Sequence, residues 1–341
     1  MPKAKQKLRT NLLLLFCFTI IGLLLFELGG RVYFFGWSVL WPPNHASIPY
    51  LGKPRIKLPS SIPEIQIREL RPNLQTRYKK VKFITNAQGL RDKEYPLNKP
   101  ADTFRVAVIG DSHTMPAGVA IEDAYHSLLE ERFNNEMGTT NIEFISFGVG
   151  GHSMNDYRYT LETKASLYQP DMVVLGIVYN DFTIYKKTVK QQNLPPSLFL
   201  YTMQRIFRPS SITKGQKASW KVVDLQGLDG SYPREEYFRP NESYMTEHFE
   251  KIVQLTNENH IPLVVVLLDY LQLNPQWVDF WKELSDDHDA HFVDATKAFK
   301  GHNPYDYMIY RADKHPNAKA NRIFADVLYD YFKKEQLLPA S

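Results

Sequence analysis

The spacing of hydrophobic positions changes along the chain and divides it into three parts. The first part holds one uninterrupted apolar run, from Leu12 to Phe26. The second, over residues 36–75, is rich in proline and has no hydrophobic period, which is typical of an extended linker. From Phe104 onward, short apolar runs alternate with amphipathic stretches, and this pattern predicts strands that alternate with helices.

The alternating part predicts an α/β fold. Continuous apolar strands separated by helices are typical of a parallel sheet whose two faces are both covered. Five strands are expected, at Phe104–Ile109, Ile142–Phe147, Asp171–Val178, Pro262–Leu268 and His291–Val293. Helices are expected at Ala124–Asn134, Met154–Tyr168, Tyr244–Asn259, Pro275–Leu284 and Asn317–Lys334. Upstream, Tyr78–Thr85 alternates in part and predicts one further strand, with a turn at Asn86–Gly89.

The N-terminal run has a basic flank. The basic residues that precede it are Lys3, Lys5, Lys7 and Arg9. Such a flank holds the N-terminus in the cytoplasm, so the residues after the run would be translocated. The run is short for a membrane span of about 20 residues, and Glu27 interrupts it. It can be extended through Leu28 with Glu27 near the interface and with Tyr33 and Trp37 as interfacial aromatic residues. We therefore expect a retained signal-anchor over residues 11–35, preceded by a cytoplasmic basic tail over residues 1–10.

Two other interpretations of this segment stay open. It could be a cleaved signal peptide, although no convincing small-residue cleavage site follows the run. It could also be a buried helix of a soluble protein. The only cysteine, Cys17, lies within the run and excludes an intrachain disulfide framework and a cysteine-rich metal site.

The distribution of charge is uneven. A net charge of +4 is too small to indicate a nucleic-acid partner, and no nucleic-acid motif is present. Between Asp181 and Asp224, however, there are eight lysines and arginines and no acidic residue, around an apolar core at Leu198–Phe207. We interpret about 182–240 as a basic insertion that contacts anionic lipid headgroups or an acidic polymer. The alternative is a solvated basic loop.

Residues suited to chemistry follow three of the expected strands. In parallel sheets, functional groups gather where the carboxyl ends of the strands open into a crevice. The first strand ends in Gly110–His113, where Ser112 could hold its hydroxyl clear of the sheet beside helix-start amides. The second ends in the glycine cluster Gly148–Gly151, and the third is followed by Asn180, whose amide could donate to an oxyanion. Taken singly, each segment could equally be a helix cap, a loop or a turn.

A further pair of polar residues precedes the last helix. A serine nucleophile needs a histidine as general base, and the histidine needs a carboxylate to orient it. His315 and Asp313 could supply these two groups.

In this order, the four segments resemble those of the SGNH, or GDSL-like, hydrolase family, from Phe104 to about Lys334. The resemblance implies a flavodoxin-like three-layer α/β/α sandwich for the domain at residues 76–338, with no metal ion or organic cofactor. It implies Ser112 as nucleophile, His315 as base and Asp313 as the acid. The oxyanion donors would be the Ser112 amide, Gly151 and the Asn180 side chain, with Gly150 as the alternative to Gly151.

The chain departs from the family pattern at two positions. His113 replaces the usual leucine of the first block, which should change packing or access but not the nucleophile. The late block is Asp-x-His, whereas the better-known spacing has its acid at the position of Ala312. Asp306 is therefore the first alternative to Asp313.

The upstream segment Ile84–Asp92 and the N-terminal anchor resemble a membrane-tethered bacterial branch of this family. Members of that branch include O-acetyl esterases and O-acetyltransferases of cell-surface polysaccharides. The resemblance implies a periplasmic serine esterase, held in the cytoplasmic membrane, that cleaves acyl esters, O-acetyl esters foremost, of an envelope glycan or lipid through an acyl-serine. An O-acyltransferase with the same residues and a non-catalytic envelope scaffold are the alternatives, and the sequence specifies no oligomeric state.

Overall fold

The computed structural model describes residues 2–35, 56–62, 64–65, 69–136, 141–182, 242–271, 275–310 and 313–339. They belong to two units, one built on the N-terminal helix and an α/β unit that begins at Arg55, and each is described by itself. The predicted basic insertion lies outside the described residues from residue 183 onward, as does the first part of the predicted linker, at 36–55.

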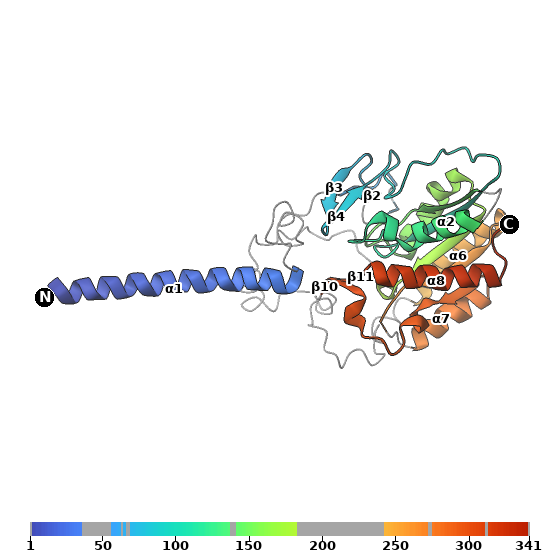
Figure 1. Ribbon diagram of the computed structural model, residues 1–341. Helices are drawn as coiled ribbons and strands as arrows, with labels where there is room; N and C mark the ends of the chain where they lie inside the picture. Colours follow the sequence, from blue (N-terminus) through green and yellow to red (C-terminus); the bar gives the residue numbers. More distant parts are fainter. Residues whose placement is uncertain are drawn as a thin grey trace. The chain divides into compact units, whose positions relative to one another are not determined.

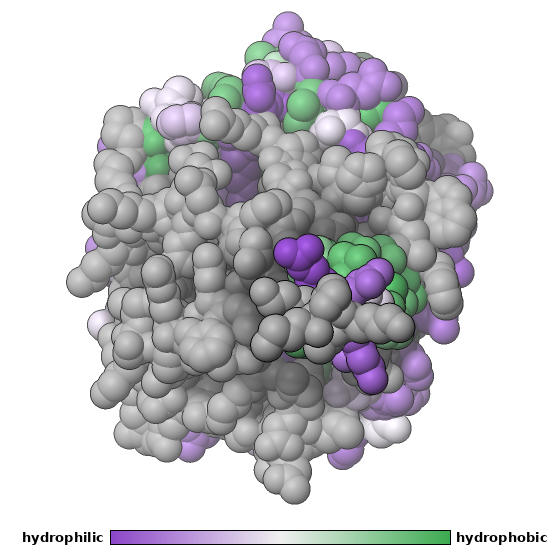
Figure 2. All heavy atoms as spheres, turned by 90° about the vertical axis from the view of Figure 1, so that its left-hand side faces the viewer, coloured by the Kyte–Doolittle hydropathy of each residue, from purple (hydrophilic) through white to green (hydrophobic). Residues whose placement is uncertain are grey.

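The N-terminal helix α1 (Pro2–Phe35) is 34 residues long. Its segment Gln6–Gly30 is long and apolar enough to cross a membrane, and none of its most apolar stretch is buried against protein. A length of 25 residues corresponds to about 37 Å of helix, which exceeds the roughly 30 Å of a hydrocarbon core. Figure 2 shows apolar side chains of α1 in green, with polar ones near its N-terminal end in purple. A helix with large exposed apolar side chains on all sides is suited to a lipid environment.

The α/β unit is organised around a five-stranded parallel sheet (Figure 1). Its strands are β5 (Thr103–Gly110), β6 (Asn141–Ser146), β7 (Met172–Ile177), β8 (Leu263–Leu267) and β9 (His291–Asp294). They lie in the spatial order β6-β5-β7-β8-β9, and each neighbouring pair is parallel. In chain order this is 2-1-3-4-5, the flavodoxin-like arrangement, whose functional crevice opens where the strand order reverses, between β5 and β7.

Helices cover both faces of the sheet, as the continuous apolar strands predict. The helices are α2 (Tyr125–Glu136), α3 (Met154–Thr163), α6 (Glu242–Glu258), α7 (Pro275–Asp286) and α8 (Ala318–Lys334). Helices α3, α6 and α7 contribute to one buried cluster and α2 and α8 to the other. Along β5, Ala107 and Ile109 belong to the first cluster and Val106 and Val108 to the second, because successive side chains of a strand point to opposite faces. The three-layer α/β/α fold is thus confirmed.

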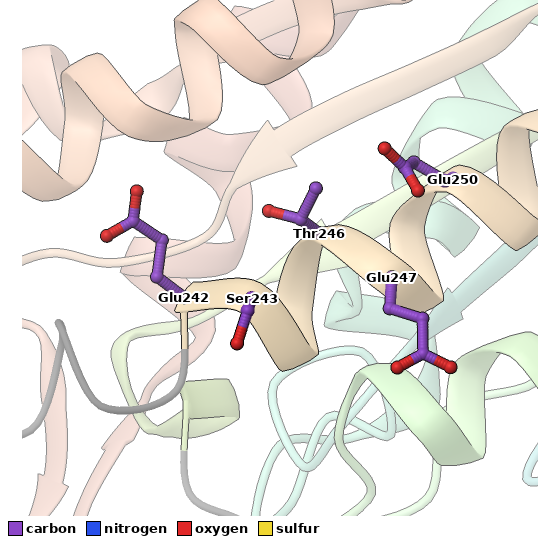
Figure 3. A pocket seen from close by; sticks show the side chains of 5 residues that line it. All are labelled: Glu242, Ser243, Thr246, Glu247 and Glu250. Carbon is purple, nitrogen blue, oxygen red and sulfur yellow. The ribbon is translucent and has the colours of Figure 1, made fainter.

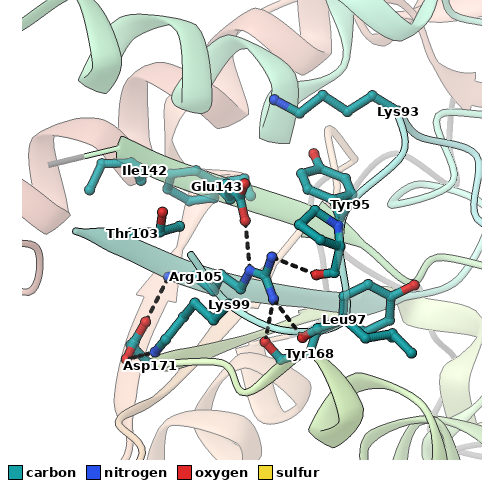
Figure 4. Close-up of polar contacts among 12 residues, drawn as sticks. Lys93, Tyr95, Leu97, Lys99, Thr103, Arg105, Ile142, Glu143, Tyr168 and Asp171 are labelled. Atoms are coloured by element: carbon teal, nitrogen blue, oxygen red, sulfur yellow. Dashed lines mark hydrogen bonds and ion pairs between the residues drawn. The ribbon is translucent and has the colours of Figure 1, made fainter. Parts of the chain in front are cut away.

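A buried arginine ties β5 to its surroundings at the end of the sheet away from the crevice (Figure 4). Arg105 is fully buried and donates from Nε to Glu143 of β6 at 2.6 Å. Its guanidinium also donates to the carbonyl oxygens of Pro96, Leu97 and Tyr168 at 2.7, 3.1 and 2.9 Å. A buried charge is tolerated when it is paired and hydrogen-bonded in this way, and the contacts fix the chain on either side of β5.

The segment before the sheet differs from the sequence-based expectation in two respects. Residues 56–75 were expected as linker, but β1 (Lys57–Leu58) pairs with β2 (Glu69–Leu70), and Ile56 and Leu70 are buried. A single strand was expected over Tyr78–Thr85. Instead, β3 (Gln75–Tyr78) and β4 (Val81–Ile84) form an antiparallel hairpin. Residues 79 and 80 form its turn with φ of 49° and 73°, a backbone that the alternating pattern does not reveal.

Candidate active site

The loop after β5 presents Ser112. Gly110 ends the strand where a Cβ atom would lie 3.0 Å from the Gly176 carbonyl oxygen of β7 and closer still to Thr114, so only glycine fits. The buried Asp111 carboxylate then accepts from the His113 amide at 2.7 Å and lies 2.9 Å from the Ser112 hydroxyl oxygen. These contacts fix the turn and leave Ser112 partly exposed.

Ser112, His315 and Asp313 form a hydrogen-bonded row. Ser112 Oγ lies 2.9 Å from His315 Nε2, although the two residues are 203 positions apart in the chain. On the other side of the ring, His315 Nδ1 contacts Asp313 Oδ1. Both residues belong to β11 (Asp313–Pro316), which pairs with β10 (Met308–Tyr310). This is the geometry of a Ser-His-Asp triad, in which the carboxylate orients the base and stabilises its charged form.

The Asp-x-His spacing allows this contact because both residues come from one short strand. The amide of His315 also donates to Asp313 Oδ1, at 3.3 Å, so the carboxylate curls over the backbone to reach the ring. Asp306, the alternative acid, lies in a short 3₁₀ helix, where its amide donates to the Asn303 carbonyl and its own carbonyl accepts from Asn317. Its carboxylate makes no hydrogen bond within the described residues. The structure therefore places Asp313 rather than Asp306 at His315.

Burial and charge around the pair shift both pKa values. Burial opposes ionisation of Asp313, but the neighbouring His315 and Lys79 hold the pKa of the carboxyl well below its ordinary value. Burial and the Lys79 charge lower the pKa of His315, against the opposing effect of Asp313. A neutral histidine beside an ionised aspartate is the resting state that a general base requires.

Lys79, from the β3–β4 turn, is a member of this site that sequence reasoning missed. Its ammonium lies 2.6 Å from Asp313 Oδ2 and 2.8 Å from His315 Nδ1. No local signal marks it, because a lysine in a Lys-Lys turn looks like a solvated surface residue. Only the placement of the hairpin beside β11 reveals the contact.

The glycine cluster after β6 lies against the loop that carries Ser112. An added Cβ on Gly148 would lie 2.6 Å from the Thr114 carbonyl carbon, and one on Gly150 would lie 3.3 Å from Ser112 Cβ. Gly151 has φ of 84°, a left-handed conformation that favours glycine. Lys57 of β1 donates to the Gly150 carbonyl and so brings a second lysine to this edge of the site.

The backbone amides at the site differ in whether they have a partner. The Gly150 amide points to the sulfur of Met115, at 3.4 Å. Neither the Ser112 amide nor the Gly151 amide donates a hydrogen bond within the described part of the chain. Free, preorganised amides beside a nucleophile are what an oxyanion hole needs, which favours Gly151 over Gly150 as the second donor.

Asn180, the third expected oxyanion donor, lies in a 3₁₀ helix (Tyr179–Phe182) directly after β7. Its side chain lies outside the described part of the structure. The next residue, Asp181, is buried and accepts from the Val178 amide and the Tyr157 hydroxyl, both at 2.8 Å. Burial and the neighbouring Asp111 raise the pKa of Asp181, and its contacts fix the backbone that carries Asn180.

His113 packs beside the row of Ser112, His315 and Asp313. Its Nδ1 lies 2.7 Å from the Leu268 carbonyl oxygen, so this nitrogen carries the proton. The ring meets that of His315 edge to face at a centroid distance of 5.8 Å. Next to Leu268, burial raises the pKa of the Asp269 carboxyl to about 6. The histidine in the usual leucine position thus joins the nucleophile turn to the end of β8.

Arg91 supports the loop that carries Ser112 and was also missed by the sequence analysis. It is buried and donates to three carbonyl oxygens of the loop, those of Met115, Pro116 and Val119. It belongs to the upstream segment Ile84–Asp92, so this segment contributes directly to the conformation of the loop that carries Ser112.

The described residues show no candidate metal site, and one pocket lies apart from the residues above. Among the described residues, no group of three or more His, Cys, Asp or Glu side chains could hold a metal ion. A depression of about 440 Å³ on α6 is acidic and contains none of the triad residues (Figure 3). Its lining residues are Glu242, Ser243, Thr246, Glu247 and Glu250.

Comparisons with known proteins agree with this picture. The model of the GDSL-like Lipase/Acylhydrolase family matches residues 108–323, which is more than half of the chain. The match contains Ser112, the glycine cluster, Asp313 and His315. Among curated proteins, none matches the chain.

Several solved structures are similar to the chain at low identity. Esterase EstA from Pseudoalteromonas sp. has a TM-score of 0.44 and 17% identity, over 69% of this chain and 99% of that one. The acetylxylan esterase Axe2 from Geobacillus stearothermophilus has a TM-score of 0.43 and 15% identity, over 67% and 93%. A lipolytic G-D-S-L family protein from Veillonella parvula has a TM-score of 0.40 and 15% identity, over 68% and 99%.

Proposed function

This chain belongs to the GDSL-like lipase/acylhydrolase family, and we propose that it is a membrane-anchored serine esterase with Ser112 as its nucleophile. The observation that carries the proposal is the 2.9 Å contact between Ser112 Oγ and His315 Nε2, on a ring whose other nitrogen contacts Asp313. Alignment of these three side chains is required for catalysis but not for a non-catalytic scaffold.

The steps of ester hydrolysis follow from the contacts among Ser112, His315 and Asp313. His315 Nε2 accepts the Ser112 proton while Oγ attacks the ester carbonyl, and Asp313 stabilises the imidazolium that forms. The carbonyl oxygen becomes an oxyanion, which the Ser112 and Gly151 amides and the Asn180 side chain bind. His315 returns the proton to the departing alcohol and leaves an acyl-serine. Water, deprotonated by His315, then releases the acid and restores Ser112.

We propose O-acetyl esters of a cell-envelope glycan as the substrate class. Anchoring of the chain in a membrane through the apolar α1 suits a polymer that is made or displayed at that membrane. The resemblance of the anchor and the Ile84–Asp92 segment to polysaccharide O-acetyl esterases supports the same class. We place the reaction on the periplasmic side.

Activity on defined esters tests the proposal. Full-length protein in detergent is incubated with acetyl, butyryl and octanoyl nitrophenyl esters and with acetylated polysaccharide, and the released acid is measured. We expect the fastest turnover on acetyl esters, release of acetate from the glycan, and loss of both activities in Ser112→Ala. Adding an unacetylated glycan to the nitrophenyl acetate reaction then separates hydrolysis from transfer. Acetylated glycan formed faster than free acetate would assign an acyltransferase instead.

A further inference from the structure

The β3–β4 turn has an unusual backbone for its residues. Lys79 and Lys80 form a two-residue hairpin loop in which both φ angles are positive, 49° and 73°. Such turns normally hold asparagine or glycine, because other side chains are disfavoured at positive φ. Two consecutive lysines therefore store local strain, which persists only where the surroundings compensate for it.

The compensation for Lys79 lies in its side chain. Its side chain is only 7% exposed, and its ammonium lies 2.6 Å from Asp313 Oδ2 and 2.8 Å from His315 Nδ1. Gly118 leaves room for the aliphatic part, since a Cβ on that residue would lie 3.2 Å from both Cβ and Cδ of Lys79. The strained turn thus delivers a buried cation to the acid of the catalytic row.

We propose that Lys79 is a positioning residue of the triad, which holds the second oxygen of Asp313 and keeps His315 neutral between turnovers. The inference rests on the proposed serine-esterase function. Lys79 does not reach the reacting atoms, because the Asp313 carboxylate and the His315 ring stand between its ammonium and Ser112. Its action is therefore indirect, through the charge and orientation of its two neighbours.

The contacts assign the proton positions. Asp313 is ionised and accepts from His315 Nδ1 through Oδ1, and it accepts from Lys79 through Oδ2. Since Lys79 is cationic and lies close to Nδ1, a second proton on the ring would bring two positive charges together. Burial and this like charge lower the pKa of His315. The base is therefore available at lower pH than a solvent-exposed histidine.

Other charged and titratable groups face the same cluster from the surrounding elements. They do not replace Lys79. Among the described residues, Asp313 forms ion pairs with Lys79 and with the His315 ring alone. Tyr78 from β3 and Tyr270 after β8 interact with Asp313, His113 interacts with His315, and Asp111 contacts Ser112. Arg91 interacts with Tyr78, and Asp269 with His113 and Tyr270.

The pH dependence of catalysis tests the inference. In Lys79→Met, which keeps the length of the side chain but not its charge, the pKa of His315 should rise. The acidic limb of the kcat/KM profile should then move up by about one pH unit, as expected when a charge is removed within about 4–6 Å. At pH values below the limb this corresponds to roughly a tenfold loss, whereas a purely structural role would lower activity equally at every pH.

Two controls accompany this variant. Lys80→Met removes a charge from the other position of the same turn, also at positive φ, and should leave the limb in place. Lys79→Arg restores a cation and should return the limb towards its original pH even if turnover is lower. If Lys79→Met does not fold, as judged by circular dichroism, Lys79→Gln repeats the measurement with hydrogen-bond donors but no charge.

The outcomes separate the two proposals. An acidic limb that stays in place in Lys79→Met and in Lys79→Gln, or that moves equally in Lys80→Met, would overturn the role of Lys79 while leaving the esterase intact. Wild-type protein that neither hydrolyses an ester nor reacts with a fluorophosphonate would overturn the esterase proposal, and the role of Lys79 with it.

Discussion

Single residues show what a sequence can and cannot predict about this site. Ser112, His315 and Asp313 were assigned from short segments in a fixed order, and the structure brings the three together. Lys79 was not assigned, since it lies 236 positions from His315 and no spacing rule links a hairpin to the last strand. Arg91 was not assigned for a similar reason. Its partners are backbone carbonyls, which any residues could supply, so no sequence pattern marks the contact.

The acid of the triad can be tested by one substitution. Asp313→Asn should reduce turnover by orders of magnitude, up to about 10⁴-fold, because an amide no longer holds the His315 tautomer that accepts the serine proton. The same change leaves the buried Lys79 without its anionic partner, so we also expect a lower melting temperature. Steady-state kinetics and thermal unfolding of the purified variant measure the two effects.

Asp306→Asn is the matched control for this variant, since Asp306 is the other candidate acid. It should retain wild-type turnover. The assignment of Asp313 would be contradicted if Asp313→Asn kept activity within about threefold of wild type, or if Asp306→Asn showed the larger loss.

At the scale of elements, the sequence predicted the sheet better than the segments before it. Strands β7 and β8 are continuous apolar runs, and a run of this kind can be found without tertiary information. The β3–β4 hairpin was missed because its turn has no glycine or asparagine, the residues that normally mark positive φ. The pairing of β1 with β2 was missed because each strand has only two residues, which is too short for any period.

The apolar helix α1 leads to a prediction about membrane topology. We expect the full-length protein to remain in the membrane fraction after alkaline extraction, with its α/β unit reached by protease from the periplasmic side. Leu15→Lys combined with Ile20→Lys should release it or block insertion, because each charge at the centre of a span costs about 3 kcal/mol. The apolar control, Leu15→Val combined with Ile20→Val, should stay in the membrane. A mature chain that begins after about residue 30 would show a cleaved signal peptide instead.

At the scale of the whole α/β unit, topology explains why the site forms where it does. The strand order reverses between β5 and β7, and Ser112 and Asn180 follow these two neighbouring strands. The glycine cluster follows β6, on the other side of β5. The alternation of strands and helices predicts this parallel sheet. In a parallel sheet the carboxyl ends of the strands lie at one edge, so the residues that follow them lie close together there. The hairpin packed against that edge depends on tertiary contacts, which no pattern along the chain encodes.

Covalent labelling of the nucleophile tests the central claim most directly. Full-length protein is treated with a fluorophosphonate, digested and mapped by mass spectrometry, together with Ser112→Ala and the control Ser127→Ala. Ser127 also lies beside a histidine, with its Oγ 3.4 Å from His126 Nδ1, but without the row of charged groups. We predict a single adduct on Ser112 in the wild type and in Ser127→Ala, and none in Ser112→Ala. An adduct on another residue, or equal labelling of Ser112→Ala, would contradict the account.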